Sequence, residues 1–158
     1  MAALPLRLQV LNRIVEILEA MKGDAGATFW FTAYRVVKRF ADSADAGGFP
    51  FYMVAPDSGQ APEWAGQQLA DELMAVSVKA WVNLEGDEPT TKLEKCLADV
   101  RKAVMDDQAS GPVGSLATLT LGCNLDSLET DGGVLALDGL GYFDQRFVFR
   151  IPVHWGTT

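Results

Sequence analysis

With 158 residues, the chain is long enough to bury most of its apolar surface in one core, and two independent domains are not expected. Hydrophobic residues make up 49% and charged residues 22% of the sequence, which excludes the composition of a disordered chain. The formal net charge of −8 disfavours nucleic acid as a partner of the monomer, because binding to phosphates depends on Lys and Arg. We therefore expect one folded domain, residues 1–158, without direct sequence-specific binding of nucleic acid.

The first half of the chain begins with an amphipathic segment. Residues 6–22 place apolar side chains at helical spacing, with charged side chains on the opposite side, and predict a helix. Aromatic and β-branched residues favour a strand or a hairpin arm over residues 28–40, and a short apolar run predicts a strand at residues 49–54. Residues 55–66 carry two prolines and two glycines and are expected to form an irregular loop that contains Trp64.

The second half alternates between strand and helix patterns. Residues 74–84 alternate apolar and polar side chains, which predicts a half-buried strand. A helix follows, with an apolar stripe along residues 93–104 and a polar side, including Asp99 and Arg101, that is expected to face water. Residues 117–126 alternate again and predict another strand.

Residues 143–155 show the same alternation and predict the closing strand. The order of elements is therefore helix, strands, helix, strands. Each helix has a single apolar stripe, which needs a sheet to bury it. We predict an α+β fold, with a mostly antiparallel twisted sheet of about four to six strands and two helices packed on one face.

The sequence contains no pattern typical of an enzyme site. The single histidine, His154, lies on the polar side of the closing strand, without a partner for acid-base or nucleophilic catalysis. Glycine pairs follow a helix or precede a strand, so no phosphate-binding loop is predicted. One histidine and two distant cysteines cannot make a zinc site, and Cys96 and Cys123 are expected to be buried reduced thiols. We expect no enzymatic activity, no cofactor and no metal.

The start of the sequence lacks a basic segment followed by an uninterrupted apolar run, so no signal peptide is expected. No stretch approaches the roughly 18 apolar residues that cross a bilayer. A soluble protein without a membrane partner is the resulting expectation.

A few residues are unusual for a solvated surface and are candidates for a subunit interface. Trp64 lies in the predicted loop and Trp81 on the polar side of a predicted strand, where isolated tryptophans are costly in water. Such residues either pack under their own loops or mark a contact with another chain. Arg146 and Arg150 share the polar side of the closing strand, and we expect ion pairs between them and acidic groups across the interface. The predicted interface residues are Phe49, Phe51, Trp64, Trp81, Arg146 and Arg150.

Four segments together resemble one known family. They are the opening helix Val10–Leu18, the β-rich Tyr34–Arg39, the helix Leu93–Val104 and the final strand Gly141–Val153. In order and length these elements resemble the tail terminator, or tail completion, proteins of long-tailed bacteriophages. The resemblance implies a small sheet with two helices and a hexameric ring of subunits on the end of the tail tube. It carries over no catalytic residue.

The resemblance also implies a function and a place. The ring would stop polymerisation of the tail tube and present a surface for attachment of the head. Its partners would be further copies of itself, the tail tube protein and a neck or head-completion protein. The protein would lie in the virion, at the head-proximal end of the tail, after assembly in the host cytoplasm.

Two alternatives to the tail terminator remain open. One is another phage neck or tail-tube protein. The other is a small-ligand-binding α+β domain or an enzyme, which would use a groove beside Trp64 and Trp81 and carboxylates for acid-base chemistry.

Overall fold

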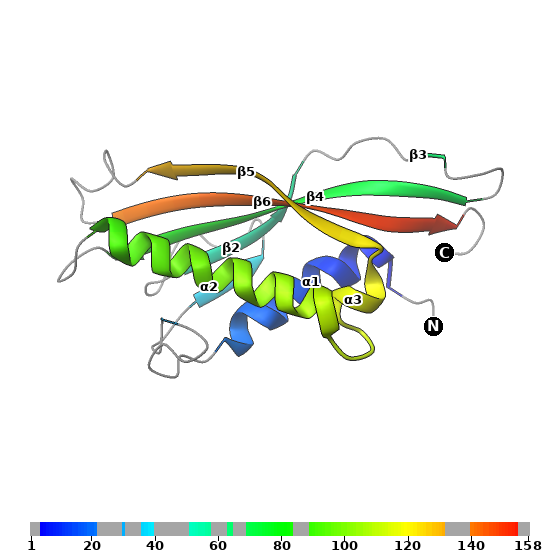
Figure 1. The fold of residues 1–158 in the computed structure, drawn as a ribbon, viewed down its shortest axis with the longest axis horizontal. Coiled ribbons are helices and arrows are strands. Elements are labelled where there is room, and N and C mark those ends of the chain that lie inside the picture. Colours follow the sequence, from blue (N-terminus) through cyan, green and yellow to red (C-terminus); the bar gives the residue numbers. More distant parts are fainter. Residues whose placement is uncertain are drawn as a thin grey trace.

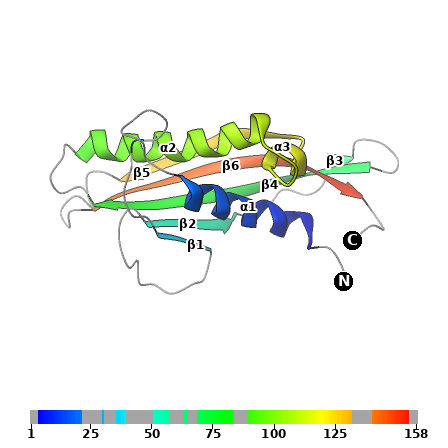
Figure 2. The ribbon, with the colours of Figure 1, turned by 90° about the horizontal axis from the view of Figure 1, so that it is seen from below.

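A twisted sheet forms the body of the protein, and its helices lie on one face of it (Figures 1 and 2). The computed structural model describes residues 4–21, 30, 36–39, 51–57, 63–64, 69–83, 89–131 and 140–154. The strands are β1 (Val36–Arg39), β2 (Phe51–Pro56), β3 (Glu63–Trp64), β4 (Leu69–Asn83), β5 (Gly122–Asp131) and β6 (Leu140–His154). The helices are α1 (Leu6–Ala20), α2 (Pro89–Ser110) and α3 (Leu116–Leu119).

Five of the six strands follow the order β1-β2-β4-β6-β5, and the sixth, β3, pairs with β4 outside this path. β1 runs parallel to β2, and every other pair is antiparallel. β4 and β6, each of 15 residues, pair over their full length, from Leu69 with His154 to Asn83 with Leu140. Strands of this length accumulate twist, which is visible where they cross in Figure 1. The predicted fold class, a mostly antiparallel sheet with two helices on one face, is confirmed, and the short α3 is an addition to it.

The core lies between the helices and one face of the sheet. Alternate side chains of β4 and β6 point into it, since a strand places successive side chains on opposite faces. Apolar stripes of both long helices cover them. The fully buried members include Val10, Ile14, Leu18, Met74, Val76, Val78, Val100, Phe143, Phe147 and Phe149. The opposite face of the sheet, which we call the open face, carries the other half of each strand.

Residues 117–126, predicted as one strand, form two elements instead. Leu116–Leu119 make α3, and β5 begins only at Gly122. The physical reason is tertiary: Leu116 is fully buried, and its backbone N–H donates to a carboxylate oxygen of Asp107 in α2 (2.8 Å). The strand prediction is therefore wrong for Ala117 and Leu119 and right from Gly122 onward.

A junction of three helices is held by Asp107. Arg13 in α1 donates to both of its carboxylate oxygens, at 3.1 and 2.6 Å, while Leu116 at the start of α3 donates to one of them. Burial acts to raise the pKa of Asp107, but the hydrogen bonds from Arg13 and Leu116 and the charge of Arg13 together hold it below its usual value. The charged form of Asp107 is therefore part of the folded state.

The polar side of α2 is less solvated than the sequence predicts. Asp99 is only 2% exposed and accepts a hydrogen bond from the backbone N–H of Trp30 (2.9 Å). Arg101 donates through Nε to the side-chain oxygen of Gln145 in β6 (2.8 Å). The expectation that Asp99 and Arg101 face water is wrong, because the helix is packed on more than its apolar stripe.

Gln145 is a fully buried polar residue with a structural task. The pairing of β5 with β6 shifts register between Leu125 and Leu128, which marks a β-bulge. Gln145 donates through Nε2 to the carbonyl oxygen of Ser127 inside this bulge (3.2 Å). Because its side-chain oxygen accepts the hydrogen bond from Arg101, Gln145 links α2 to the bulge. Both polar ends of its buried amide thus have hydrogen-bond partners, without which its burial would be costly.

The remaining sequence predictions in this region have mixed outcomes. The predicted helix at residues 6–22 ends at Ala20, and the strand predicted at residues 49–54 begins at Phe51 and runs on to Pro56. Within the segment 55–66, predicted as a loop, Glu63–Trp64 pair with β4, while residues 58–62 and 65–66 lie outside the described part of the chain.

Candidate assembly surfaces

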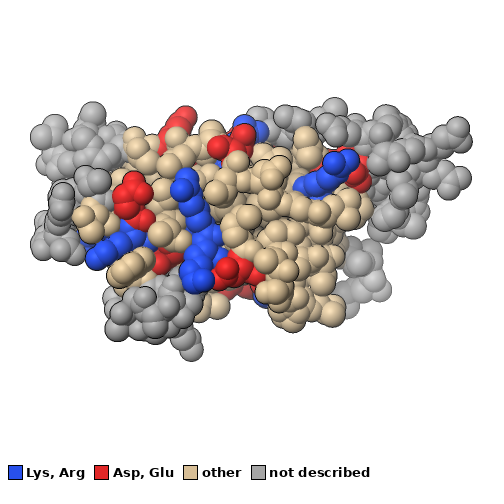
Figure 3. Space-filling model, in the orientation of Figure 1, with Lys and Arg blue, Asp and Glu red and all other residues tan. Residues whose placement is uncertain are grey.

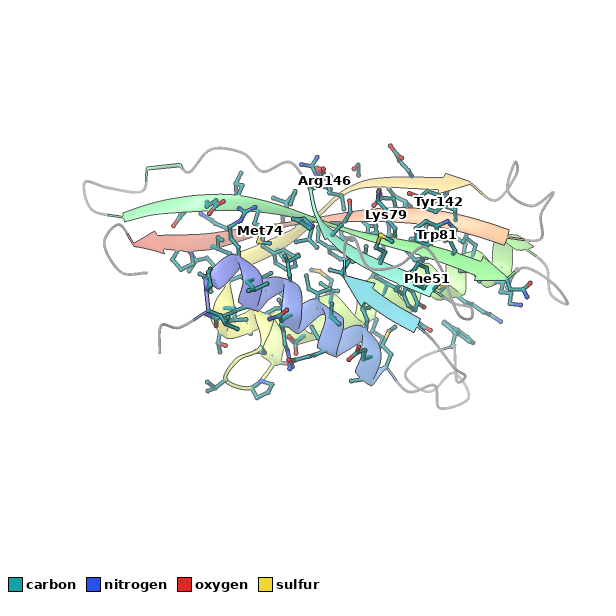
Figure 4. The ribbon with its side chains drawn as sticks, turned by 180° about the vertical axis from the view of Figure 1, so that it is seen from behind. Phe51, Met74, Lys79, Trp81, Tyr142 and Arg146 are labelled. Atoms are coloured by element: carbon teal, nitrogen blue, oxygen red, sulfur yellow. The ribbon has the colours of Figure 1, made fainter. Side chains whose placement is uncertain are left out.

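The open face carries a row of aromatic side chains across three strands (Figure 4). The ring of Trp81 in β4 lies between Phe51 of β2 and Tyr142 of β6, and both ring centroids are 5.4 Å from it. Cross-strand aromatic pairs of this kind contribute about 0.5–1.5 kcal/mol beyond area burial. Phe51 is 5% exposed and therefore stabilises the sheet from within, whereas Trp81 and Tyr142 are half-buried and reach the surface.

Tyr142 completes the row, and the sequence prediction did not single it out. Burial, followed by the charges of Asp144 and Glu129, raises the pKa of its hydroxyl. In the sequence, its position two residues before Asp144 places Tyr142 on the polar side of the closing strand, and this is the only pattern by which it could have been assigned to the open face. Only the register, in which Trp81 pairs with Tyr142, shows that the two rings meet.

The two predicted interface arginines both find partners within the chain. Arg146 lies 3.3 Å from a carboxylate oxygen of Asp57 and 3.1 Å from one of Asp126, so it links the end of β2 to β5. Arg150 donates through Nε to Asp71 in β4 (2.5 Å). Pairs across a subunit boundary therefore stay a prediction, and these contacts show that the charges of Arg146 and Arg150 are already offset locally.

The structure brings together only some of the predicted interface residues. Phe51 and Trp81 are cross-strand neighbours, whereas Arg146 pairs with Ser77, four residues along β4 from Trp81, or about 13 Å by strand rise. Arg150 lies four residues farther along β6. Trp64 belongs to β3, where it pairs with Ala70, and Phe49 lies outside the described residues.

A small hollow lies on the open face beside Arg146. It has a volume of about 180 Å³ and is lined by Leu73, Ala75, Asn124, Asp126, Arg146 and Val148. Pockets that hold drug-sized ligands usually measure about 300–1,000 Å³. The hollow is smaller than such pockets and is not lined by Trp81, so it is not the groove that the ligand-binding alternative requires.

Exposed leucines lie along the outer strand β5 and immediately before it. Leu121, Leu125 and Leu128 are 59%, 43% and 38% exposed. The sequence pattern places Leu121 and Leu125 on an apolar side expected to be buried, but the structure leaves both side chains exposed. A further exposed aromatic, Trp30 (54%), stacks under the ammonium group of Lys95 on α2, at 5.0 Å from the ring centroid.

Charged side chains are mixed in sign over the helix layer. Basic and acidic side chains are interspersed over the face on which α2 lies (Figure 3).

Among the residues that the structure describes, no three His, Cys, Asp or Glu side chains are grouped so that they could hold a metal ion. None of the described helices is long and apolar enough to span a membrane.

Comparisons with known proteins reveal a shared fold. No protein-family profile and no curated protein sequence matches the chain. Among solved structures, the fold is similar to a chain of the "Virion of native gene transfer agent (GTA) particle", with a TM-score of 0.58 and 12% sequence identity. The similarity covers 96% of this chain and 100% of that chain. The whole described architecture, rather than one motif, is therefore common to the two proteins.

Proposed function

We propose that the protein is a structural component of a phage-like virion. The observation that carries the proposal is the similarity in fold to a chain of the gene transfer agent particle, because it extends over the full length of that chain. An assembly role also fits the exposed leucines along β5 and the partly exposed rings of Trp81 and Tyr142 on the open face. The protein acts through contacts with other proteins and not as an enzyme.

Within the virion, the role that we propose is that of a tail terminator. The element order that resembles this family is present in the fold: an opening helix, β strands, the long α2 and a long closing strand. Copies of the chain form a ring, a hexamer in this proposal, on the head-proximal end of the tail tube. The ring stops tube polymerisation and provides the surface to which the neck or head-completion protein binds.

Deletion of the gene in the producing strain tests this proposal. The expected result under the electron microscope is tails of irregular, excessive length that are not joined to heads, and complementation should restore them. Tails of normal length joined to heads would refute the proposal. Complete absence of tail tubes would indicate a tube protein, and normal tails without heads would indicate another neck protein.

A further inference from the structure

β5 forms one margin of the sheet. In the strand order it follows β6, and no strand of the described residues pairs with its outer side. An outer strand exposes backbone N–H and C=O groups that can bind another strand, so proteins either protect such a strand or use it for assembly. β5 extends over ten residues without a proline, and the bulge between Leu125 and Leu128 shifts its pairing with β6 without ending the strand.

The side chains of β5 also suggest that another chain covers it. Leu121, Leu125 and Leu128 form an exposed apolar row along this margin. Leu125 and Leu128 pair in register with Phe147 and Gln145, which belong to the helix-covered side of the sheet. A neighbour that continues the sheet, with a helix beneath it, would bury these leucines.

The two margins of the sheet differ in charge. The sequence of β5 contains three acidic residues, Asp126, Glu129 and Asp131, and no basic residue. The sequence of β1, at the opposite margin, contains Lys38 and Arg39 and no acidic residue. Arg146 lies 3.1 Å from a carboxylate oxygen of Asp126, and the sequence of β5 still has an excess of acidic over basic residues. Charges are thus separated between the margins, unlike the mixed charges over α2 (Figure 3).

We propose that β5 of one copy pairs with β1 of the next copy, so that subunits join head to tail through their sheet margins. Opposite charges at the joint offset the repulsion between subunits that each carry a net charge of −8. Pairing of β5 with β5 would place like charges together and is disfavoured. A head-to-tail joint repeats in one direction and closes into a ring when the rotation permits. The inference deepens the proposed function, and its ring form rests on that proposal.

Charge reversal at each margin tests the joint. Glu129→Lys with Asp131→Lys reverses β5, and Lys38→Glu with Arg39→Glu reverses β1. Each variant alone should associate at least about tenfold more weakly than the wild type in sedimentation velocity at low ionic strength. A one-to-one mixture should assemble again, because every joint in alternating order then unites opposite charges.

A matched control has the same change of net charge elsewhere. Glu19→Lys with Glu94→Lys alters two exposed helix positions by the same amount as the β5 variant, and it should assemble as the wild type does. Circular dichroism verifies that all variants are folded. If a reversal variant does not fold, a variant that carries both Val37→Cys and Leu125→Cys provides the second measurement, which is the formation of a disulfide between copies. The two strands are four strand spacings apart, about 19 Å, so such a disulfide links only different copies.

The outcomes separate the inference from the proposed function. Reversal variants that assemble as well as the wild type, or a β1 variant unaffected while the β5 variant dissociates, would overturn the inference and leave the tail terminator proposal intact. Open chains that the mixture restores would support the margin pairing and contradict the ring. A wild type that stays monomeric, together with a Val37→Cys/Leu125→Cys variant that yields no disulfide-linked ladder, would overturn both the pairing and the ring.

Discussion

Replacement of Asp107 by alanine should destabilise the protein more than replacement of its partner Arg13. The Asp107 side chain is 10% exposed and that of Arg13 is 24% exposed. Hydrogen bonds to charged groups contribute about 1.5–3 kcal/mol each, and the partial exposure of Arg13 places its contribution at the lower end of this range. Arg13→Ala should therefore cost about 1–2 kcal/mol in the free energy of unfolding.

Asp107→Ala should cost more, about 3 kcal/mol, because it removes two interactions. It leaves Arg13 with only the more exposed Glu16 among the described residues, at 3.3 Å, and also leaves the backbone N–H of the buried Leu116 without its acceptor. An unsatisfied buried N–H alone costs about 1–3 kcal/mol. The two substitutions share the Arg13 contact, so their costs in the double variant should not add fully.

Urea unfolding at pH 7, followed by tryptophan fluorescence and circular dichroism, measures these costs as shifts of the midpoint at constant slope. The matched control is Asp106→Ala, at the residue next to Asp107. It removes the exposed ion pair with Lys102 and should cost less than about 0.5 kcal/mol. An Asp107→Ala variant as stable as Asp106→Ala would refute the reasoning. An Arg13→Ala variant with the same cost as Asp107→Ala would show that the bond to α3 contributes nothing.

Three further predictions concern the same region and the core. The contribution of Asp107 to the free energy of unfolding should be full above the unfolded Asp pKa of about 3.9 and should disappear as the pH falls through the lower folded pKa. The cost of Asp107→Asn should therefore shrink below about pH 4. A cost that is constant down to about pH 2 would contradict this. Gly111→Ala should lower the free energy of unfolding by about 1–3 kcal/mol, since the added Cβ would lie 2.5 Å from Ser115 Oγ and 2.9 Å from the Asp107 carbonyl oxygen. The control is Gly122→Ala, whose added Cβ would have no atom within 4 Å and which should leave the urea midpoint nearly unchanged. Burial raises the pKa of the Cys96 thiol to about 12. A thiol reagent at pH 8 should therefore leave Cys96 unlabelled until urea unfolds the chain. Labelling of Cys96 in the folded protein within minutes would argue against a closed core.

The sequence predicted the long elements well, because each has a strong period of its own. The two-residue alternation of β4 and β6 and the helical stripe of α2 identify which side chains face the core. The same alternation placed Trp81 and Arg146 on the polar side, where the structure finds them on the open face. The weaker segments were predicted less accurately: α3 was read as strand, since four residues are too few to show a helical period.

Partners were beyond the sequence. Arg146 could be recognised as an unusual residue, but not its ion pairs with Asp57 and Asp126, which come from distant parts of the chain. Tyr142 became part of the aromatic row only through its register with Trp81. Such contacts depend on which strands become neighbours.

By itself, the sequence determined the α+β class, the two helical stripes and the inner and outer sides of the long strands. Only the tertiary structure decided the strand order, the burial of Asp99 and the position of β5 at a margin with its leucines exposed. The physical reason is that a periodic pattern reports the two sides of one segment, which are set by local backbone geometry. Strand neighbours and margins are set by the combined packing of segments far apart in the chain, and at those margins we propose that the protein meets its next copy.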